Sequence, residues 1–218
     1  MVQVRPHRCA GLLFSVALWT LLLALTGCGS APPLERDRNY SLAPKVPQTG
    51  AGAPTGAILL VNDLAARGFL GGRQIVYRTR EEPLVVDRYE HYLWAEPLPR
   101  ALAQSLVGAI RDAGVFRFVV IPADRARADY LLGGEVSQFE HRPTDQPPRV
   151  VATLNLSLVS ADQRRSLWTR QYSGEEPVST ATPDAMAEAF NRLTARLVGE
   201  VVRDLRALRP RLKPASGH

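Results

Sequence analysis

The stretch from 89 to 121 constrains the fold most, because it predicts a strand, a helix and a second strand in direct succession. The central helix carries apolar residues at steps of four and three, namely Leu98, Leu102, Leu106, Ala109 and Ala113. Such a stripe has to be buried against a sheet. Pro97 favours a helix start, and Gly114 is typical of the left-handed residue that ends a helix. The apolar run 116–121 then predicts a buried strand.

Further strands are predicted on the N-terminal side of the helix. The apolar run 57–61 indicates a buried strand, and 40–43 is a candidate for the first strand of the domain. Residues 75–77 and 84–93 flank a polar turn, which favours a β-hairpin. Neither face of 84–93 is wholly apolar, which indicates a strand near an edge of the sheet or beneath a partner.

On the C-terminal side, the sequence predicts three strands joined in series, at 129–141, 149–159 and 166–172. The middle strand alternates cleanly, with one apolar face made of Ala152, Leu154, Leu156 and Leu158, and one polar face made of Thr153, Asn155 and Ser157. We therefore expect an antiparallel meander with one polar face. The pair Gly133 and Gly134 in the first strand indicates a bulge or a close approach of another backbone.

A long amphipathic helix closes the domain. Thr182 is a typical N-cap, Pro183 suits the first helical position, and the apolar stripe ends at Arg209–Pro210. These elements predict the fold class α/β (α+β), a two-layer domain in which a mixed, largely antiparallel sheet is covered by two long amphipathic helices. Residues 211–218 are expected to form a disordered tail.

Residues 1–27 predict a secretory signal peptide, because two arginines precede an apolar run and a site of small residues. The run ends in Leu25-Thr-Gly-Cys28, which resembles the bacterial lipobox, whose cysteine is acylated and becomes the mature N-terminus. The alternative is a transmembrane anchor with a chance cysteine, for which the apolar run is short. We expect lipidation at Cys28 and a tether over 28–39. Gly29 rather than Asp after the cysteine indicates delivery to the outer membrane.

Cysteine usage and charge exclude several classes of protein. The chain has two cysteines, Cys9 in the signal peptide and Cys28, so the mature domain has no thiol for a disulfide, a thiolate metal site or a nucleophile. The formal net charge is +6, and loss of the signal peptide with its two arginines leaves +4 without runs of like charge. A mildly basic exported protein is a poor candidate for nucleic-acid binding.

The sequence contains no recognisable catalytic set. It lacks a Gly-x-Ser-x-Gly motif and paired zinc ligands, and Gly71–Gly72 is not followed by the lysine-bearing helix that a phosphate loop needs. His91 near Glu96 is the one local cluster with acid–base potential, and a strand histidine near the surface is the simpler interpretation. We therefore predict no catalytic residue, no metal and no cofactor.

Several motifs resemble those of the ABC-type transport auxiliary lipoproteins, the group that includes the paraquat-inducible protein C type. The central signature is Tyr92-x-Trp94-Ala-Glu96-Pro-Leu98 followed by a helix and Gly114-x-Phe116, with further matches at 40–42, 72–78 and 128–136. The resemblance implies an auxiliary domain over 40–210 in a non-catalytic lipoprotein on the periplasmic face of the outer membrane. It implies a hydrophobic or lipid cargo, and as partners a protein with mammalian-cell-entry domains and inner-membrane ABC or permease subunits. Independently of the resemblance, the mixed faces of the 84–93 strand need cover, which a homo-oligomer would supply.

Within the signature, Tyr92, Trp94 and Glu96 form a candidate partner surface. For Trp94 the alternative is packing beneath the start of the following helix. A second functional hypothesis stands beside the transport one, namely a lipoprotein that regulates a cell-wall enzyme or serves as a binding module in the cell envelope. A periplasmic hydrolase is disfavoured because no nucleophile with a base is found.

Overall fold

The structure, a computed structural model, describes residues 36–47 and 53–214. The predicted signal peptide, Cys28 and the first part of the tether lie outside the described residues. Within the described ranges, no helix is long and apolar enough to cross a membrane.

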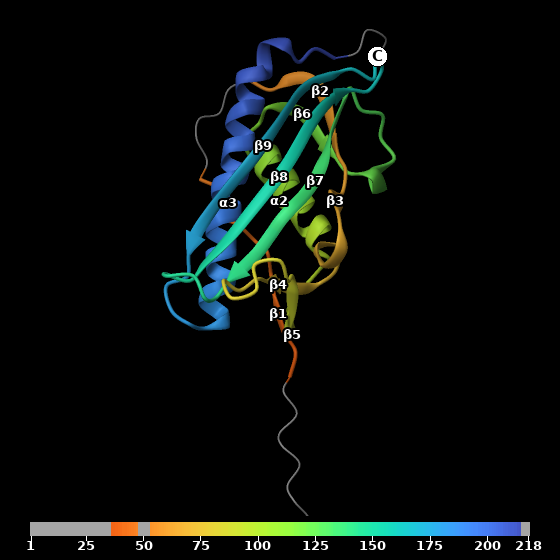
Figure 1. The fold of residues 1–218 in the computed structure, drawn as a ribbon. Helices are drawn as coiled ribbons and strands as arrows, with labels where there is room; N and C mark the ends of the chain where they lie inside the picture. Colours follow the sequence, from red (N-terminus) through yellow and green to blue (C-terminus); the bar gives the residue numbers. More distant parts are fainter. Residues whose placement is uncertain (1–35, 48–52, 215–218) are drawn as a thin grey trace, which may run out of the picture. The chain divides into compact units, whose positions relative to one another are not determined.

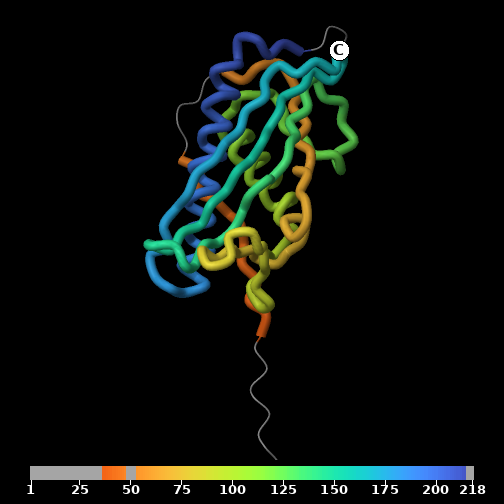
Figure 2. The backbone as a smooth tube through the Cα atoms, viewed as in Figure 1, coloured from red at the N-terminus to blue at the C-terminus, as the bar shows by residue number. Residues whose placement is uncertain are grey.

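The described strands form one mixed sheet that curls into a half-barrel in an α+β fold (Figure 1, Figure 2). Their bounds are β1 (Arg38–Tyr40), β2 (Thr55–Val61), β3 (Ala65–Ala66), β4 (Gln74–Tyr77), β5 (Asp87–Trp94), β6 (Phe116–Val120), β7 (Tyr130–Arg142), β8 (Arg149–Ser160) and β9 (Ser166–Pro177). The long strands β7, β8 and β9 pair antiparallel, whereas β1 with β5, β4 with β7, and β2 with β6 and β7 pair in parallel. The predicted fold class and meander are confirmed.

The predicted hairpin is also confirmed, because β4 and β5 pair antiparallel, but its second strand begins at Asp87 rather than at 84, and residues 84–86 belong to the loop. In the strand order β1-β5-β4-β7-β2-β6, β5 has only the three-residue β1 beyond it. The mixed faces of β5 therefore belong to a strand near an edge of the sheet, as the sequence indicates.

Two long helices cover one face of the sheet (Figure 1). Helix α2 (Leu98–Asp112) packs against β2 and β6, and α3 (Pro183–Leu208) packs against β8, β9 and α2. Both helices have the predicted ends. The Thr182 hydroxyl accepts a hydrogen bond from the backbone N–H of Ala185, and Gly114 has a φ of 58° just after α2. In the described part of the chain, short 3-10 helices lie at Gly68–Gly71 and Pro122–Asp124 in connections between strands, and at Arg209–Arg211 directly after α3.

Trp94 is a core residue. It is 2% exposed, and its ring lies edge-on to Phe139 of β7 and Phe190 of α3, with centroid distances of 5.8 and 5.3 Å. The two phenylalanine rings stack at 4.6 Å. Trp94 therefore cannot belong to the partner surface for which it was a candidate, and the alternative of core packing is the one that the structure shows.

The first strand differs from the sequence prediction. It spans Arg38–Tyr40 rather than 40–43, and the residues after it leave the sheet for α3. Asn191 of α3 holds this segment, because its side-chain oxygen accepts from the N–H of Ala43 and its amide donates to the carbonyl of Ser41. The side chain of Asn191 thus makes the backbone hydrogen bonds that a neighbouring strand would otherwise make with residues 41–43. Because Asn191 is distant in sequence, no local pattern predicts this contact.

Residues 211–214, expected to be part of a disordered tail, are packed against the domain, while 215–218 lie outside the described residues. Leu212 is buried. The Tyr130 hydroxyl donates to the carbonyl of Lys213 at 2.8 Å and accepts from its N–H at 3.0 Å. Burial of Leu212 and the two hydrogen bonds of the Tyr130 hydroxyl therefore hold residues 211–214 against the domain.

Of the two neighbouring glycines in β7, only Gly134 lies at a close approach of two backbones. A Cβ atom on Gly134 would lie 2.0 Å from the carbonyl oxygen of Asn155 in β8, and the residue has a positive φ of 153°. A Cβ on Gly133 would meet nothing nearer than Asn62, at 3.9 Å. The two glycines therefore have different roles, although the sequence presents them as a pair.

We predict that Gly134→Ala destabilises the protein by about 3 kcal/mol or more, because β7 and β8 would have to separate locally. The matched variant Gly133→Ala should change the free energy of unfolding by less than about 1 kcal/mol. Chemical denaturation followed by circular dichroism measures both. Equal effects of the two substitutions would contradict the close approach.

Candidate functional site

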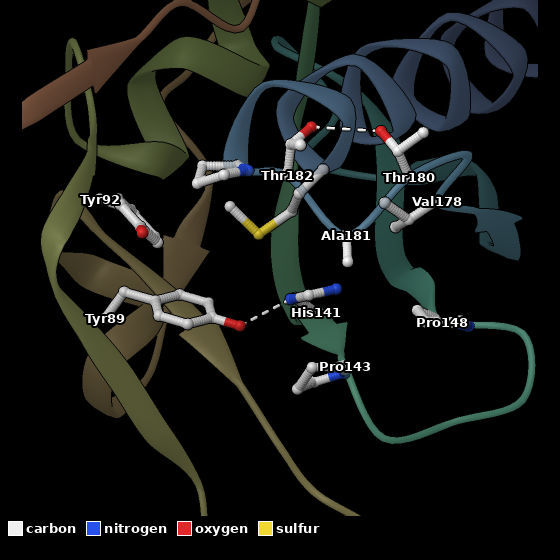
Figure 3. Close-up of a pocket in the computed structure, with 11 residues that line it drawn as sticks. Tyr89, Tyr92, His141, Pro143, Pro148, Val178, Thr180, Ala181 and Thr182 are labelled. Atoms are coloured by element: carbon white, nitrogen blue, oxygen red, sulfur yellow. Dashed lines mark hydrogen bonds between the residues drawn. The ribbon is translucent and has the colours of Figure 1, made fainter.

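A pocket of about 240 Å³ lies where β5, the end of β7, the β7–β8 loop and the segment before α3 meet (Figure 3). It is lined by Tyr89, Tyr92, His141, Pro143, Pro148, Val178, Thr180, Ala181, Thr182, Pro183 and Met186. We call this site the tyrosine pocket. Its lining combines aromatic, proline and aliphatic groups with a few hydroxyls, which is the usual composition of a binding site for an apolar group.

Short-range contacts hold the loops around the tyrosine pocket in place. The backbone N–H of Val178 donates to the carbonyl of Pro148 at 2.8 Å, which ties the segment before α3 to the β7–β8 loop. The hydroxyls of Thr180 and Thr182 lie 3.2 Å apart, and Thr182 also caps α3. The walls are thus fixed by the same residues that start the helix, so the pocket is preformed.

The floor of the pocket is a tyrosine–histidine pair. A hydrogen bond of 2.7 Å joins the Tyr89 hydroxyl to Nδ1 of His141. His141 is 9% exposed, and burial lowers its pKa to about 4, while burial also raises the pKa of the Tyr89 hydroxyl. Both groups are therefore neutral near pH 7. Nε2 of His141 is buried and has no hydrogen-bond partner among the described residues.

Tyr89 of this pair also belongs to a row of three tyrosine rings, which we call the ladder. The ring of Tyr89 lies 4.6 Å from Tyr77 of β4 and 5.1 Å from Tyr92 on its own strand. The ladder gives one wall of the pocket an aromatic surface of fixed geometry, since each ring is held by its neighbour.

A buried ion cluster lies next to the pocket in sequence, at Glu140. Its carboxylate is 3.3 Å from Nε of Arg78 and 2.9 Å from Arg142, and it also accepts from Gln138. Arg78 directly follows β4, and Gln138 and Arg142 belong to β7, so the cluster fixes the position of β4 against the end of β7. The pocket depends on this alignment, because β4 in turn carries β5 with its two tyrosines.

The lining suits the binding of an apolar group. It includes no thiol and no carboxylate, and its imidazole and phenol bond to each other. Within the described ranges, no group of three or more histidine, cysteine, aspartate or glutamate residues is placed to hold a metal ion. The volume is below the roughly 300 to 1,000 Å³ of pockets that enclose a whole small ligand. It fits one aromatic ring or a segment of an acyl chain.

The structure separates the three residues of the candidate partner surface. Tyr92 lines the tyrosine pocket, Trp94 is in the core, and Glu96 accepts a hydrogen bond from Gln104 of α2 at 2.9 Å. His91 lies near the surface, with Nδ1 3.1 Å from Asp37, as the simpler interpretation expects. Tyr92 and Glu96 are accessible and stay candidates for contact with a partner, and this role remains a prediction.

Sequence reasoning missed most of the pocket. Tyr89, His141 and the segment 178–183 are separated by about 40 to 90 residues along the chain. They meet only because β5, β7 and α3 converge. The one available signal was the density of proline and threonine in 177–183, which indicates a fixed turn but not what it encloses.

The comparisons with known proteins identify the family. A model of the family described as the ABC-type transport auxiliary lipoprotein component matches residues 40–202. The chain belongs to this family. Members of the ABC-type transport auxiliary family are components of transport systems by that description, and the match covers all of the strands from β2 to β9 and most of α3. The resemblance seen in the signature motif is thereby confirmed.

Two solved structures share the fold of this chain. The crystal structure of protein XCC0632 from Xanthomonas campestris, of the DUF330 family, superposes with a TM-score of 0.68 at 26% identity, covering 76% of this chain and 92% of that one. A crystal structure of an uncharacterized protein gives a TM-score of 0.61 at 21% identity, covering 78% and 99%, and this likeness concerns the fold alone. A search of the curated proteins finds no match.

We predict that the neutral state of His141 makes stability fall with acid. The pKa is about 4 in the folded protein and about 6.5 in the unfolded chain, so the contribution is fully present above pH 6.5. It is lost as pH falls toward 4, by on the order of 3 kcal/mol.

Denaturant unfolding at pH 7 and pH 4.5 measures this slope. His141→Gln, which cannot ionise in this range, should flatten the pH dependence, whereas His91→Gln at the surface should leave it as in the wild type. A wild-type slope retained in His141→Gln would place the titrating group elsewhere.

Proposed function

We propose that the protein is an outer-membrane-anchored periplasmic lipoprotein that serves as a non-catalytic auxiliary component of an ABC-type, mammalian-cell-entry-linked lipid transport system. The observation that carries this proposal is the family match over 40–202, which makes the chain a transport auxiliary component. The anchor at Cys28, the outer membrane and the lipid cargo are inferred from the lipobox and from the resemblance.

The tyrosine pocket supports a hydrophobic cargo. Its wall of aromatic rings, the methionine and prolines of its lining and its neutral floor favour an apolar group over a charged one. Since the volume admits only a segment of a lipid, the pocket would hold part of an acyl chain while other subunits enclose the rest. Energy and permeation would belong to the ABC and permease subunits.

Affinity capture of the full-length protein from solubilised membranes tests the function. We expect a protein with mammalian-cell-entry domains, or an ABC or permease subunit, to be enriched over a Cys28→Ala control, which would lack the acyl anchor. Mass spectrometry identifies the proteins and the extracted lipids. Enrichment of cell-wall synthases without any transport subunit would overturn the proposal and favour the regulator of a cell-wall enzyme.

A pocket-filling variant tests the lipid role separately. Ala181 is exposed on the rim and its side chain points toward His141, so Ala181→Phe should occupy the pocket (Figure 3). We predict that co-purified lipid falls by about tenfold, equivalent to about 1.4 kcal/mol. The matched control is Ala123→Phe, at an exposed alanine of the Pro122–Asp124 turn far from the pocket. An equal amount of lipid in both variants would contradict the role of the pocket.

A further inference from the structure

Exposed apolar side chains concentrate around the loop between β4 and β5. Among the described residues, six large hydrophobic side chains are exposed, and four of them are Phe69, Leu84, Val85 and Val86. Leu84 is 93% exposed, and Phe69 and Val86 line one cavity of about 410 Å³. We call these four residues the loop patch. Apolar groups gathered in this way at a loop mark a surface that is covered in the working protein.

The loop patch lies at the end of the sheet from which the chain leads to Cys28. β1 runs parallel to β5, with Arg38 opposite Tyr92, and Asp37 contacts His91. The chain before Arg38 is therefore directed toward the start of β5, and Leu84, Val85 and Val86 immediately precede that start. Figure 1 shows the β4–β5 loop, the start of β1 and the start of α3 at one end, away from the end of α3.

The segment between Cys28 and Arg36, the first described residue, is too short to hold this end of the domain far from a membrane to which Cys28 is anchored. Eight residue steps separate Cys28 from Arg36. At about 3.3 to 3.6 Å per residue they span at most roughly 29 Å, and any slack brings the domain closer. If Cys28 carries the acyl anchor, the loop patch lies within reach of the same bilayer.

The charges of the loop indicate how it would meet that surface. Residues 78–88 contain three arginines and three acidic residues, so the loop has no net charge. Arg78 is already paired with Glu140, and the guanidinium of Arg88 lies over the ring of Phe69 at 4.8 Å. Attraction to anionic lipid therefore cannot be the main force. The remaining force is burial of the apolar side chains at the boundary between lipid headgroups and acyl chains.

We propose that the loop patch inserts into the interfacial layer of the membrane that holds the lipidated N-terminus, so that the domain docks on the bilayer by this end. The proposal rests on the proposed lipidation of Cys28. The bilayer is the occupant, rather than a second copy of the chain, because the patch shares its end of the domain with the start of β1 and a short tether.

Site-directed fluorescence on the full-length acylated protein in vesicles tests the proposal. Once Cys28 is acylated and Cys9 is removed with the signal peptide, Leu84→Cys supplies the only free thiol for an environment-sensitive dye. Phe118→Cys on β6 is the matched control, because Phe118 is 53% exposed and lies on the opposite edge strand. Mass spectrometry of the N-terminal peptide first establishes the acylation, so that its failure is seen independently.

In vesicles of phosphatidylethanolamine and phosphatidylglycerol, the dye at 84 should shift to the blue and be quenched by brominated acyl chains, with neither effect at 118. Vesicles of zwitterionic lipid alone should give the same result. Equal solvent exposure at 84 and 118 would overturn the proposal. So would a blue shift at 84 without quenching, which indicates burial against a second protein copy, or quenching only with anionic lipid, which indicates adsorption by charge.

Discussion

The contact of three aromatic rings, Trp94, Phe139 and Phe190, is the interaction on which the rest of this structure depends. It joins β5, β7 and α3, and β5 and β7 are not adjacent strands in the sheet. All three side chains are 2% exposed or less, so their apolar area is removed from water almost completely. Because β1 and β4 pair with β5, this contact secures the short parallel strands to the long antiparallel meander.

The same contact sets the tyrosine pocket. Tyr92 precedes Trp94 by two residues on the same strand, so its side chain lies on the same face and is carried to the edge of the core. Phe139 likewise precedes His141 by two residues on β7. Burial of one aromatic residue on each strand therefore brings a tyrosine and a histidine into the lining of the pocket. The pocket is a continuation of the core rather than a separate feature.

Neighbouring residues at the end of β7 show two ways of burying a polar group. The Glu140 carboxylate is buried among two arginines and a glutamine, which supply opposite charge and hydrogen bonds. His141, on the opposite face, is buried without a counter-charge, and its pKa falls to about 4. Glu140 lines the cavity that includes part of the loop patch, whereas His141 lines the tyrosine pocket. The end of β7 thus has charged groups on the face that carries Glu140 and neutral groups on the face that carries His141.

Local pattern was enough to predict the helices, the hairpin and the meander, since caps and alternation act over a few residues. Thr182 and Gly114 are where the sequence placed them, and β8 alternates as predicted. What failed was long-range: the role of Asn191 in holding 41–43, and the anchoring of Lys213 by Tyr130. The candidate site was found only at Tyr92, because its other walls come from strands and loops that no periodicity connects.

Charge and apolar surface are divided between the two ends of the domain. The end opposite to the loop patch has an excess of basic residues in the connections before β7, after β8 and after α3, among them Arg125, Arg127, Arg164, Arg165, Arg209, Arg211 and Lys213. Free in solution, this end would be the one drawn to anionic lipid. If Cys28 is acylated as proposed, the short tether that leads from the start of β1 would impose the other orientation, because attraction between exposed charges is screened within about 10 Å in salt. The basic end would then face away from the membrane, where a partner rather than a lipid surface would meet it.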